Sequence, residues 1–460
     1  MTVLSVSDLP SPVAINWLGH LNVLKQPNMH LQLREWASQF DGIYRIRLAH
    51  QTAVVISERQ IVQQILKCRP EKFRRYRAIE SVFSGLNING IFSAEGDNWK
   101  RQRKLINPAF NGENLRYFFP SMSDISNRMI EKTAVLSQTQ ESCDIKHLFT
   151  QYTVDLIGKL AFGYDIDTLS GKNQVLHHHL ATVFPGLNTR IASPLPLWKL
   201  YKTRKDHLLE AANAFIRDFL QMRISETKER LFQQPDLHQH PENLLQAMVA
   251  QQNLSEESLS DEMILANAVT LLLAGEDTTA NSLAWLCHLL STRDDLQDQL
   301  FSEINDLPDD ALSQWPQPSL PLLIACIHES MRVKPVVPML FTEPLSDITV
   351  NERLHLKKGT RTILLLNAQG DDKDRFDSPR TFHPERWLND HPCRINDMMP
   401  FGGGLRLCPG RSLALLEMKL AMSRLIQQFK LIPLDADKVT ERFDFIVVPD
   451  HLRILFELRR

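Results

Sequence analysis

Long hydrophobic runs and cysteine pairs are nearly missing from this 460-residue sequence. The longest apolar run, residues 264–274, is interrupted by Asn267 and followed at once by two acids, so it indicates a central buried helix and not a membrane span. The six cysteines are widely spaced and form no CxxC, which argues against a disulfide framework or a zinc site. Their distribution fits a reducing cytosol.

The chain also lacks a strong net charge and an obvious linker. A formal net charge of −2 gives no reason to expect a nucleic-acid partner. Residues 1–27 hold no apolar run long enough for a membrane anchor or a signal peptide, so we expect a cytoplasmic protein. Because no repeat and no Gly/Ser- or Pro-rich linker occurs, we predict a single domain over residues 1–460, present as a monomer.

Hydrophobic periodicity predicts a mostly α protein of the α+β class. The expected helices cover residues 58–66, 98–105, 121–136, 153–162, 207–226, 261–290, 321–333 and 411–429. The expected strands cover residues 43–48, 53–56, 348–356, 362–366 and 446–456. The polar stretch 232–262 is predicted to be an exposed connection between helices.

The glycine-rich stretch 401–410 presents Cys408 on a loop directly before a helix. Glycines let the backbone approach a flat cofactor and leave amide N–H groups free to point at the sulfur. The helix N-terminus, Arg406 and Arg411 are expected to favour the thiolate over the thiol, as a metal ligand requires. Cys408 is therefore predicted to bind an iron atom, whereas the other cysteines are expected to be small buried hydrophobes.

The ligand loop matches the pattern F-x-x-G-x-R-x-C-x-G at Phe401, Gly404, Arg406, Cys408 and Gly410. This pattern resembles the haem-ligand loop of the cytochrome P-450 family. The resemblance covers nearly the whole chain through the motifs below, and it implies the P-450 fold, with haem b held between the longest helix and the helix after the loop. A regulatory protein that senses haem at a Cys-Pro site is the alternative that this loop alone leaves open.

Residues 274–279, Ala-Gly-Glu-Asp-Thr-Thr, lie inside the long apolar pattern, where a glycine and two acids are unexpected if burial alone mattered. The segment resembles the family's oxygen-activation motif A-G-x-D-T-T. The resemblance implies that Thr278 supports iron-bound dioxygen and that Asp277 relays protons from solvent. Glu276 faces differently on the helix and is the weaker candidate. An exposed acid beside a back-bonded threonine is the structural alternative.

Two further sets of residues match the family. Trp99 and Arg103 fit W-x-x-x-R, share one side of a helix, and are both hydrogen-bond donors suited to haem propionates. Glu329 and Arg332, together with Arg386 of a segment resembling P-E-R-F, are implied to form a buried ion network with a structural role. The resemblance implies that haem is bound by Cys408, Trp99, Arg103, Arg406, Phe401, Gly402, Gly410 and Ala274.

Some features depart from the family or carry no site. Thr342 stands where the family often has an arginine directed toward a propionate, and residues 367–376 lack the usual R-D-P motif. His177, His178 and His179 are consecutive and therefore point around a helix in different directions. They predict a solvated face and not a metal site.

These motifs together predict a haem-thiolate monooxygenase that inserts one atom of dioxygen into a hydrophobic fatty acid, terpenoid or steroid. The alternatives are a peroxide-driven or non-redox haem-thiolate enzyme, whose relatives commonly lack the pair Asp277 and Thr278, and a haem sensor, which has no use for a proton relay. By family position the substrate pocket is expected to be lined by Phe83, Leu86, Ile88, Ile91, Phe184, Leu187, Leu271, Val337, Met339, Ile446 and Val447.

The sequence contains no segment that we identify as flavin- or iron–sulfur-binding. Electrons are therefore expected to come from NAD(P)H through a separate ferredoxin or flavodoxin and its reductase. Lys100, Arg101 and Lys104 share the helix of Trp99 on faces turned away from the propionates, and they are predicted to attract such an acidic partner. An ordinary solvated basic face is the alternative.

Overall fold

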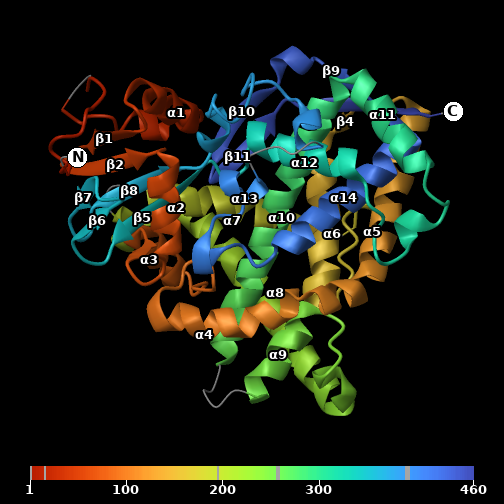
Figure 1. Ribbon diagram of the computed structural model, residues 1–460. Coiled ribbons are helices and arrows are strands. Elements are labelled where there is room, and N and C mark those ends of the chain that lie inside the picture. Colours follow the sequence, from red (N-terminus) through yellow and green to blue (C-terminus); the bar gives the residue numbers. More distant parts are fainter. Residues whose placement is uncertain are drawn as a thin grey trace.

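The computed structural model describes residues 3–14, 17–172, 174–193, 196–254, 260–388 and 394–459. Helices dominate, and the short strands form small sheets, which confirms the predicted mostly α, α+β class (Figure 1). The helices are α1 (Met29–Gln39), α2 (Arg59–Lys67), α3 (Arg77–Gly85), α4 (Gly96–Ile106), α5 (Gly112–Thr139), α6 (Ile145–Phe162), α7 (Gln174–Ala192), α8 (Arg204–Gln233), α9 (Leu244–Leu254), α10 (Asp261–Ser291), α11 (Asp294–Asn305), α12 (Pro321–Val333), α13 (Ile395–Met398) and α14 (Arg411–Gln428).

The strands are β1 (Ile43–Leu48), β2 (Gln51–Ile56), β3 (Phe73–Arg75), β4 (Cys143–Asp144), β5 (Met339–Pro344), β6 (Ile348–Val350), β7 (Leu354–Leu356), β8 (Arg361–Leu365), β9 (Phe429–Leu434), β10 (Thr440–Asp444), β11 (Ile446–Asp450) and β12 (Arg453–Leu458). The largest sheet has the order β1-β2-β8-β5-β3, in which only β2 and β8 are parallel. In this sheet Arg75 of β3 pairs directly with Thr342 of β5. The remaining strands form sheets of two or three strands.

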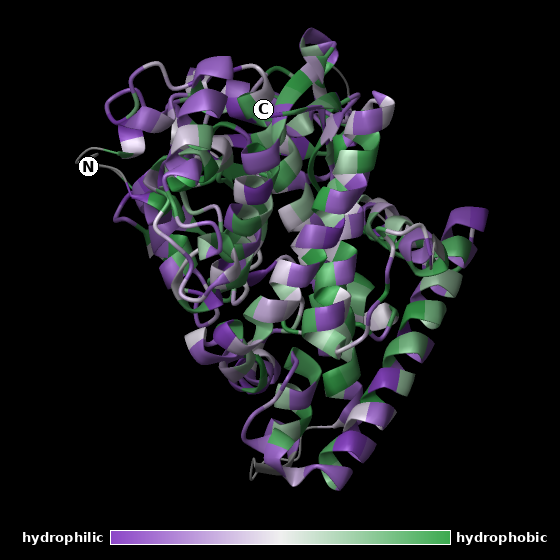
Figure 2. Cartoon of the chain, turned by 90° about the vertical axis from the view of Figure 1, so that its right-hand side faces the viewer, coloured by the Kyte–Doolittle hydropathy of each residue, from purple (hydrophilic) through white to green (hydrophobic). Residues whose placement is uncertain are grey.

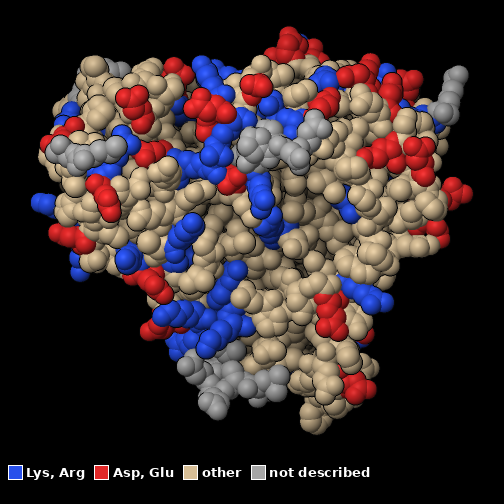
Figure 3. All heavy atoms as spheres, viewed as in Figure 1, with Lys and Arg blue, Asp and Glu red and all other residues tan. Residues whose placement is uncertain are grey.

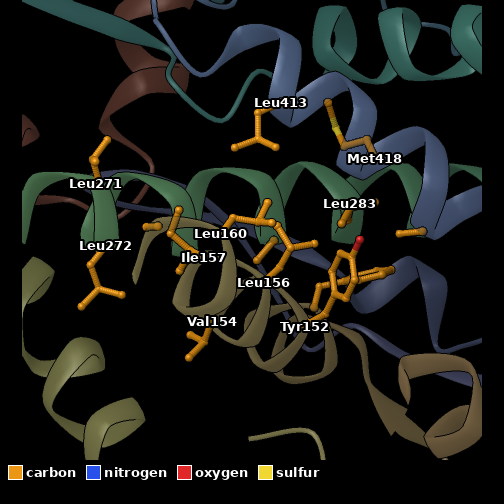
Figure 4. Close-up of a cluster of buried hydrophobic side chains, with 14 of the residues drawn as sticks. Tyr152, Val154, Leu156, Ile157, Leu160, Leu271, Leu272, Leu283, Leu413 and Met418 are labelled. Atoms are coloured by element: carbon orange, nitrogen blue, oxygen red, sulfur yellow. The ribbon is translucent and has the colours of Figure 1, made fainter. Parts of the chain in front are cut away.

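Helix α10 runs through the middle of the molecule and packs along α6, with α14 close by (Figures 1 and 4). Both α6 and α10 are apolar on nearly all sides, as expected for helices surrounded by protein. Gly275 allows the close approach of α6, because a Cβ atom there would lie 2.8 Å from the Ile157 side chain. Next to it, the Thr153 hydroxyl donates a hydrogen bond of 2.8 Å to the Glu276 carbonyl. The unexpected glycine of the 274–279 segment therefore has a packing reason.

Hydrophobic residues gather along the central helices, and hydrophilic residues occupy much of the outer surface of the chain (Figure 2). In the part of the chain that the structure describes, no helix combines the length and the apolarity needed to span a bilayer.

The prediction of an exposed connection over residues 232–262 is wrong in part. Helix α9 lies inside this stretch, and its residues Leu244, Leu245 and Met248 are fully buried. Polar residues at the start of this helix made it hard to recognise from the sequence. Asn243, directly before α9, accepts a hydrogen bond of 2.9 Å from the Gln246 N–H. Residues 255–259 of this stretch lie outside the described residues.

Candidate active site

A cavity of about 1130 Å³ lies between α10, α14 and the loop that carries Cys408. Cys408, Phe401, Gly402 and Gly410 line it from the loop, and Ala274 and Thr278 line it from α10. The Cys408 N–H donates to the Phe401 carbonyl at 3.0 Å, which closes the loop on itself. Gly404 has a positive φ of 64°, and a Cβ atom there would lie 2.3 Å from the Leu66 carbonyl oxygen. The loop therefore requires glycine at that point.

Cys408 is exposed to this cavity and not on the outer surface, so burial raises the pKa of its thiol. The Gly410 N–H and the Arg103 guanidinium oppose that rise in pKa. Arg406 does not lower the pKa of this thiol as predicted, because its guanidinium pairs with Glu95 at 2.7 Å and donates to the Ala94 carbonyl at 2.8 Å. A metal ion bound at the sulfur would favour the thiolate over the thiol.

Buried arginines gather at one side of the cavity, and two of them were not foreseen from the sequence. Arg69 and Arg75 line the cavity beside Arg406. Buried nitrogen atoms without a hydrogen-bond partner occur on all three: Nε and Nη2 of Arg69, Nε of Arg75, and Nε and Nη1 of Arg406. Burial lowers the pKa of each, that of Arg406 to about 10, and Glu95 is the carboxylate that opposes this shift in all three.

This arginine cluster, Arg69, Arg75 and Arg406, has more buried positive charge than the structure neutralises. Buried donors in native proteins are normally satisfied, so the surplus indicates an anionic ligand. Trp99 and Arg103 of α4 line the same side of the cavity. The donor set fits the two carboxylates of haem, next to a thiol that faces the same space.

The arginine cluster also accounts for a departure from the family. Thr342 bonds to Thr362 within the sheet, and Arg75 occupies the paired position on the neighbouring strand. Arg75 and Thr342 both line the cavity, so a guanidinium is present at this place on the neighbouring strand. The sequence did contain an indication of this arginine. Arg74 and Arg75 follow Phe73 in a short strand, and successive side chains of a strand point to opposite faces, so one of the two arginines faces the interior.

The segment 274–279 places Thr278 at the cavity wall. Its hydroxyl donates a hydrogen bond of 2.7 Å to the Ala274 carbonyl, as the structural alternative predicted for a threonine in mid-helix. Asp277 is partly buried, and burial raises the pKa of its carboxyl, while Lys146 opposes that rise. Asn281 donates to the Asp277 carboxylate at 3.2 Å. Glu276 is buried, does not line the cavity, and burial raises the pKa of its carboxyl well above the usual value.

The predicted pocket residues divide into two groups. Seven line the cavity: Phe83, Ile91, Phe184, Leu271, Val337, Met339 and Ile446. The other four, Leu86, Ile88, Leu187 and Val447, are buried but do not line it, so their prediction is corrected here. Val447 follows Ile446 in β11 and points to the opposite face of the strand. Leu86 lies against α8, where Asn213 donates to its carbonyl at 2.9 Å.

Aromatic residues form part of the cavity wall, and two of them were missed. Phe92 lies 5.3 Å from Phe83, and Phe445 lies 5.9 Å from Phe92 and 5.3 Å from Phe184, measured between ring centroids. All four line the cavity. Because three separate chain segments and α7 contribute these rings, no local pattern in the sequence could have grouped them.

Glu329, Arg332 and Arg386 meet in a buried ion network. Arg332 binds both carboxylate oxygens of Glu329, at 2.7 and 2.8 Å, and Arg386 donates to Glu329 at 3.1 Å. The Trp387 indole and the His383 N–H add hydrogen bonds of 2.8 and 3.0 Å to the same carboxylate. These donors hold the pKa of Glu329 below its usual range despite burial.

The histidine triplet lies on α7, as a helical face. His177 meets His147 with ring centroids 5.4 Å apart, and His179 stacks on Phe215 at 4.3 Å. Among the residues that the structure describes, no group of three or more His, Cys, Asp or Glu side chains could hold a metal ion.

Comparison with known proteins decides the family. The family model described as "Cytochrome P450" matches residues 9–456. The chain belongs to the cytochrome P450 family. Probable cytochrome P450 508A2 of Dictyostelium discoideum is 25% identical, over 99% of this chain and 95% of its own length. Cytochrome P450 3A29 of Sus scrofa is 25% identical over 92% and 86%, and Protein LUTEIN DEFICIENT 5, chloroplastic, of Arabidopsis thaliana is 24% identical over 92% and 73%.

Family membership confirms the resemblance and the enzyme class: this cytochrome P450 is a haem-thiolate monooxygenase, with haem and iron. Enzymes of the family take electrons from NAD(P)H through redox partners and bind hydrophobic substrates.

Proposed function

We propose that this cytochrome P450 binds haem b in the cavity and oxidises a hydrophobic small molecule, a fatty acid, a terpenoid or a steroid. The observation that carries the proposal is that the Cys408 sulfur and the Thr278 segment face one cavity whose other walls are mostly apolar and aromatic. Such a cavity suits a hydrophobic ligand with few polar anchors.

Haem would be held by Cys408 at the iron, by Phe401, Gly402, Gly410 and Ala274 around the ring, and by a donor set at the propionates. That donor set contains Trp99, Arg103, Arg406, Arg69 and Arg75. When bound, haem with a thiolate ligand supplies the chemistry that activates dioxygen. The protein contributes ligation, orientation and electrostatics.

The chain's own residues deliver protons and exclude water. Asp277 holds its proton closer to neutral pH than a free aspartate, since burial raises the pKa of its carboxyl. We propose that Asp277 supplies protons and that the adjacent Thr278 hydroxyl passes them into the cavity. The four phenylalanine rings make part of the wall of the same cavity apolar, which disfavours water there.

Replacing Cys408 by alanine tests the ligand assignment. We expect loss of the carbon-monoxide difference band that is typical of thiolate-ligated ferrous haem, because the sulfur facing the cavity is gone. The matched control is Cys68→Ala, which removes a half-buried thiol outside the cavity and should keep the band. A surviving band in Cys408→Ala would reject the assignment.

Asp277 and Thr278 favour dioxygen chemistry over a peroxide-driven or non-redox enzyme and over a haem sensor. Thr278→Ala should keep haem but divert electrons to peroxide, measured as product formed per NADPH consumed. Titration with dodecanoic acid, a monoterpene and a steroid, followed by the Soret shift on displacement of water from iron, selects among the substrate classes. A protein that binds haem but responds to none of them would contradict the proposed substrates.

We further propose that an acidic ferredoxin or flavodoxin docks at α4. Lys100, Arg101 and Lys104 are exposed on this helix, and basic side chains gather over its region of the surface (Figure 3). Asp97 lies 3.2 Å from Lys100 and partly neutralises it, so the attraction of an acidic partner depends on the three basic residues together. Long-range attraction of this kind raises the rate of association and is screened by salt.

Changing Lys100, Arg101 and Lys104 together to glutamate tests the docking surface. Reduction by an acidic ferredoxin should slow severalfold, and its rate should lose most of its dependence on ionic strength. The control reverses Lys357 and Lys358, which are exposed between β7 and β8. Equal slowing in both variants would mean that total charge and not this surface attracts the partner.

A further inference from the structure

A cleft of about 860 Å³ opens on the surface next to the cavity that contains Cys408. It lies at one edge of the largest sheet, where the parallel strands β2 and β8 begin and the antiparallel strand β5 ends, on the side of the molecule that carries β6 and β7 (Figure 1). The first residues of α3 form another wall. Residues 5–7 form the rim, and Leu4 fixes it by pairing with Leu354 of β7. This outer cleft is within the range of about 300–1,000 Å³ that is typical of small-molecule sites.

The outer cleft and the Cys408 cavity share part of one wall. Gln51, Tyr76 and Arg361 line both spaces. The Arg361 guanidinium lies over the Tyr76 ring, 4.5 Å from the ring centroid. The Cys408 cavity is mostly apolar, whereas most residues that line the outer cleft are polar or charged. A molecule that occupies both spaces is therefore amphipathic and passes along the pair Tyr76 and Arg361.

Positive charge exceeds negative charge in the outer cleft. Arg77, Lys357 and Arg361 are its cations, and Glu343 is the one acid among the described residues that line it. Three cations and one acid leave a surplus of two positive charges, with histidine counted as neutral. Glu343 is 5% exposed and lies 3.6 Å from both Arg74 and Arg77, so its charge is already neutralised within the chain. The surplus therefore favours an anionic ligand.

The two donors on the shared wall have no acceptor within the chain. Among the described residues, the Arg361 guanidinium and the Tyr76 hydroxyl have neither a hydrogen-bond partner nor an ion-pair partner. Arg74, two residues before Tyr76, is instead bonded to Glu80. Burial raises the pKa of the Tyr76 phenol, so its hydroxyl keeps the proton at neutral pH and can donate a hydrogen bond. A guanidinium and a phenol that are free to donate side by side favour an anion rich in acceptor oxygens.

Charge and size favour a phosphate over a carboxylate as the ligand. A phosphate monoester carries about −1.5 to −2 charges at neutral pH and offers three acceptor oxygens, whereas a carboxylate carries a single charge. The phosphate therefore matches the surplus of two positive charges, and its oxygens can accept from Arg361 and Tyr76 at the same time. Guanidinium groups bind phosphate through two parallel hydrogen bonds. The remaining volume, next to Thr52 and Ser81, accommodates further polar atoms such as those of a glycerol unit.

We propose that the outer cleft binds the phosphorylated head group of the substrate while its apolar part extends into the Cys408 cavity. This proposal rests on the proposed function and narrows its substrate class to a hydrophobic chain or ring system joined to a phosphate. Arg361 and Tyr76 bind the phosphate where the two spaces meet. The aromatic rings of the cavity contact the apolar part, and oxidation is expected on the portion far from the phosphate.

Ligands with one chain and different head groups test the proposal on the ferric holoenzyme. Dodecyl phosphate, dodecanoate and dodecanol are titrated below their critical micelle concentrations, as are farnesyl phosphate and farnesol, and the Soret shift is the readout. In at least one series the phosphate should bind about tenfold more tightly than the alcohol, and this preference should weaken as the salt concentration rises. Equal binding of phosphate and alcohol would overturn the proposal and leave the monooxygenase assignment intact. The absence of a Soret shift with all of these compounds would instead contradict the proposed function, and the head-group site with it.

A glycerol phosphate distinguishes two sources of the phosphate. Dodecanoyl glycerol 3-phosphate is added to the dodecyl series and compared with dodecyl phosphate. Tighter binding would identify a glycerophosphate head group and hence a lipid, because the glycerol then fills the remaining volume of the outer cleft. Weaker binding would identify a phosphate attached directly to the apolar part.

Arg361→Met tests where the phosphate binds. Methionine keeps a contact with the Tyr76 ring and removes the guanidinium, so the phosphate of the series that responds should bind about tenfold more weakly, while its alcohol binds as before. Tyr76→Phe keeps the ring and should weaken phosphate binding severalfold. The control is Lys358→Met, which removes an exposed cation that does not line the outer cleft and should change neither affinity. Haem content is measured for each variant. Equal weakening of phosphate and alcohol in Arg361→Met, or a loss of phosphate binding in Lys358→Met as large as in Arg361→Met, would overturn the proposal.

Discussion

Two buried clusters of charge in this protein use the same residue types and behave in opposite ways. In the ion network of Glu329, Arg332 and Arg386, each carboxylate oxygen accepts more than one hydrogen bond. In the arginine cluster of Arg69, Arg75 and Arg406, five guanidinium nitrogens are buried without a partner. The carboxylate of the ion network is fully hydrogen-bonded within the chain, whereas the arginine cluster lacks acceptors for part of its buried donors.

The difference separates structure from function. A buried charge that finds all its partners inside the chain stabilises one arrangement of the backbone, here α12 against the segment 383–387. A surplus of buried donors instead costs free energy until a ligand supplies acceptors. The comparison therefore assigns the ion network to the fold and the arginine cluster to the cofactor, and the following variants test that assignment.

The largest effect is expected for Glu329→Gln. Removing this charge leaves Arg332 and Arg386 buried without a counterion, at a cost of about 3–5 kcal/mol in the free energy of unfolding. Denaturant unfolding of the protein without haem measures it. The control is Glu385→Gln, a half-buried acid of the same segment that pairs with His383 at 2.9 Å and should cost less than about 1 kcal/mol. Equal losses would contradict a special role for the ion network.

Acid should weaken the same network. The pKa of Glu329 is lower in the folded protein than in the unfolded chain. Its contribution to stability is therefore complete above the unfolded pKa of about 4.5 and is lost as the pH falls through the lower folded value. Compared with wild type, Glu329→Gln should show a flatter decline of the unfolding free energy below that pH. Parallel declines would mean that other carboxylates dominate acid unfolding.

These clusters also show how far the sequence leads. Glu329, Arg332 and Arg386 follow from short motifs, since two of them are one helical turn apart and the third has a recognisable segment around it. For Arg74 and Arg75 the sequence predicts only that one of the two points inward, and that it is Arg75 depends on β3 pairing with β5 across about 270 residues of chain. Arg69 lies before β3 and belongs to none of the motifs. Likewise, Ile446 and Val447 differ only in which face of β11 each occupies, and periodicity over so short a strand does not tell which face meets the cavity.

A smaller effect is expected for Arg75→Met, and it should weaken haem binding without lowering the stability of the protein. Methionine keeps the contact with Phe92, over which the Arg75 guanidinium lies at 3.9 Å, and removes an unpaired buried charge. The protein without haem should be as stable as wild type or more so. The haem-bound protein should release haem about tenfold faster, since one charged hydrogen bond to a propionate is lost. Transfer of haem to excess apomyoglobin measures the rate.

Arg74→Met is the matched control on the same strand. Arg74 is bonded to Glu80 and lies 3.6 Å from Glu343, so it is neutralised within the chain and does not line the cavity. This variant should lose stability without haem and keep a normal rate of haem release. If Arg74→Met and Arg75→Met behaved alike, neutralisation within the chain would not distinguish structural from cofactor-binding arginines.

The smallest effects are expected when either of two tryptophans, each with one indole N–H, is replaced by phenylalanine. Trp387 donates to Glu329 at 2.8 Å, whereas the Trp99 indole has no acceptor among the described residues and lines the cavity. Trp387→Phe should therefore cost about 1–2 kcal/mol in the protein without haem, because a charged hydrogen bond disappears. Trp99→Phe should cost less there, because no hydrogen bond is lost and its ring contact with Arg406, 4.6 Å from the ring centroid, is kept by phenylalanine, which leaves only the smaller loss of buried ring volume. In the haem-bound protein the larger effect should instead come from Trp99→Phe, because only this variant should speed haem release. A stability loss in Trp99→Phe without haem as large as that in Trp387→Phe would contradict the view that only the Trp387 N–H has a partner inside the chain.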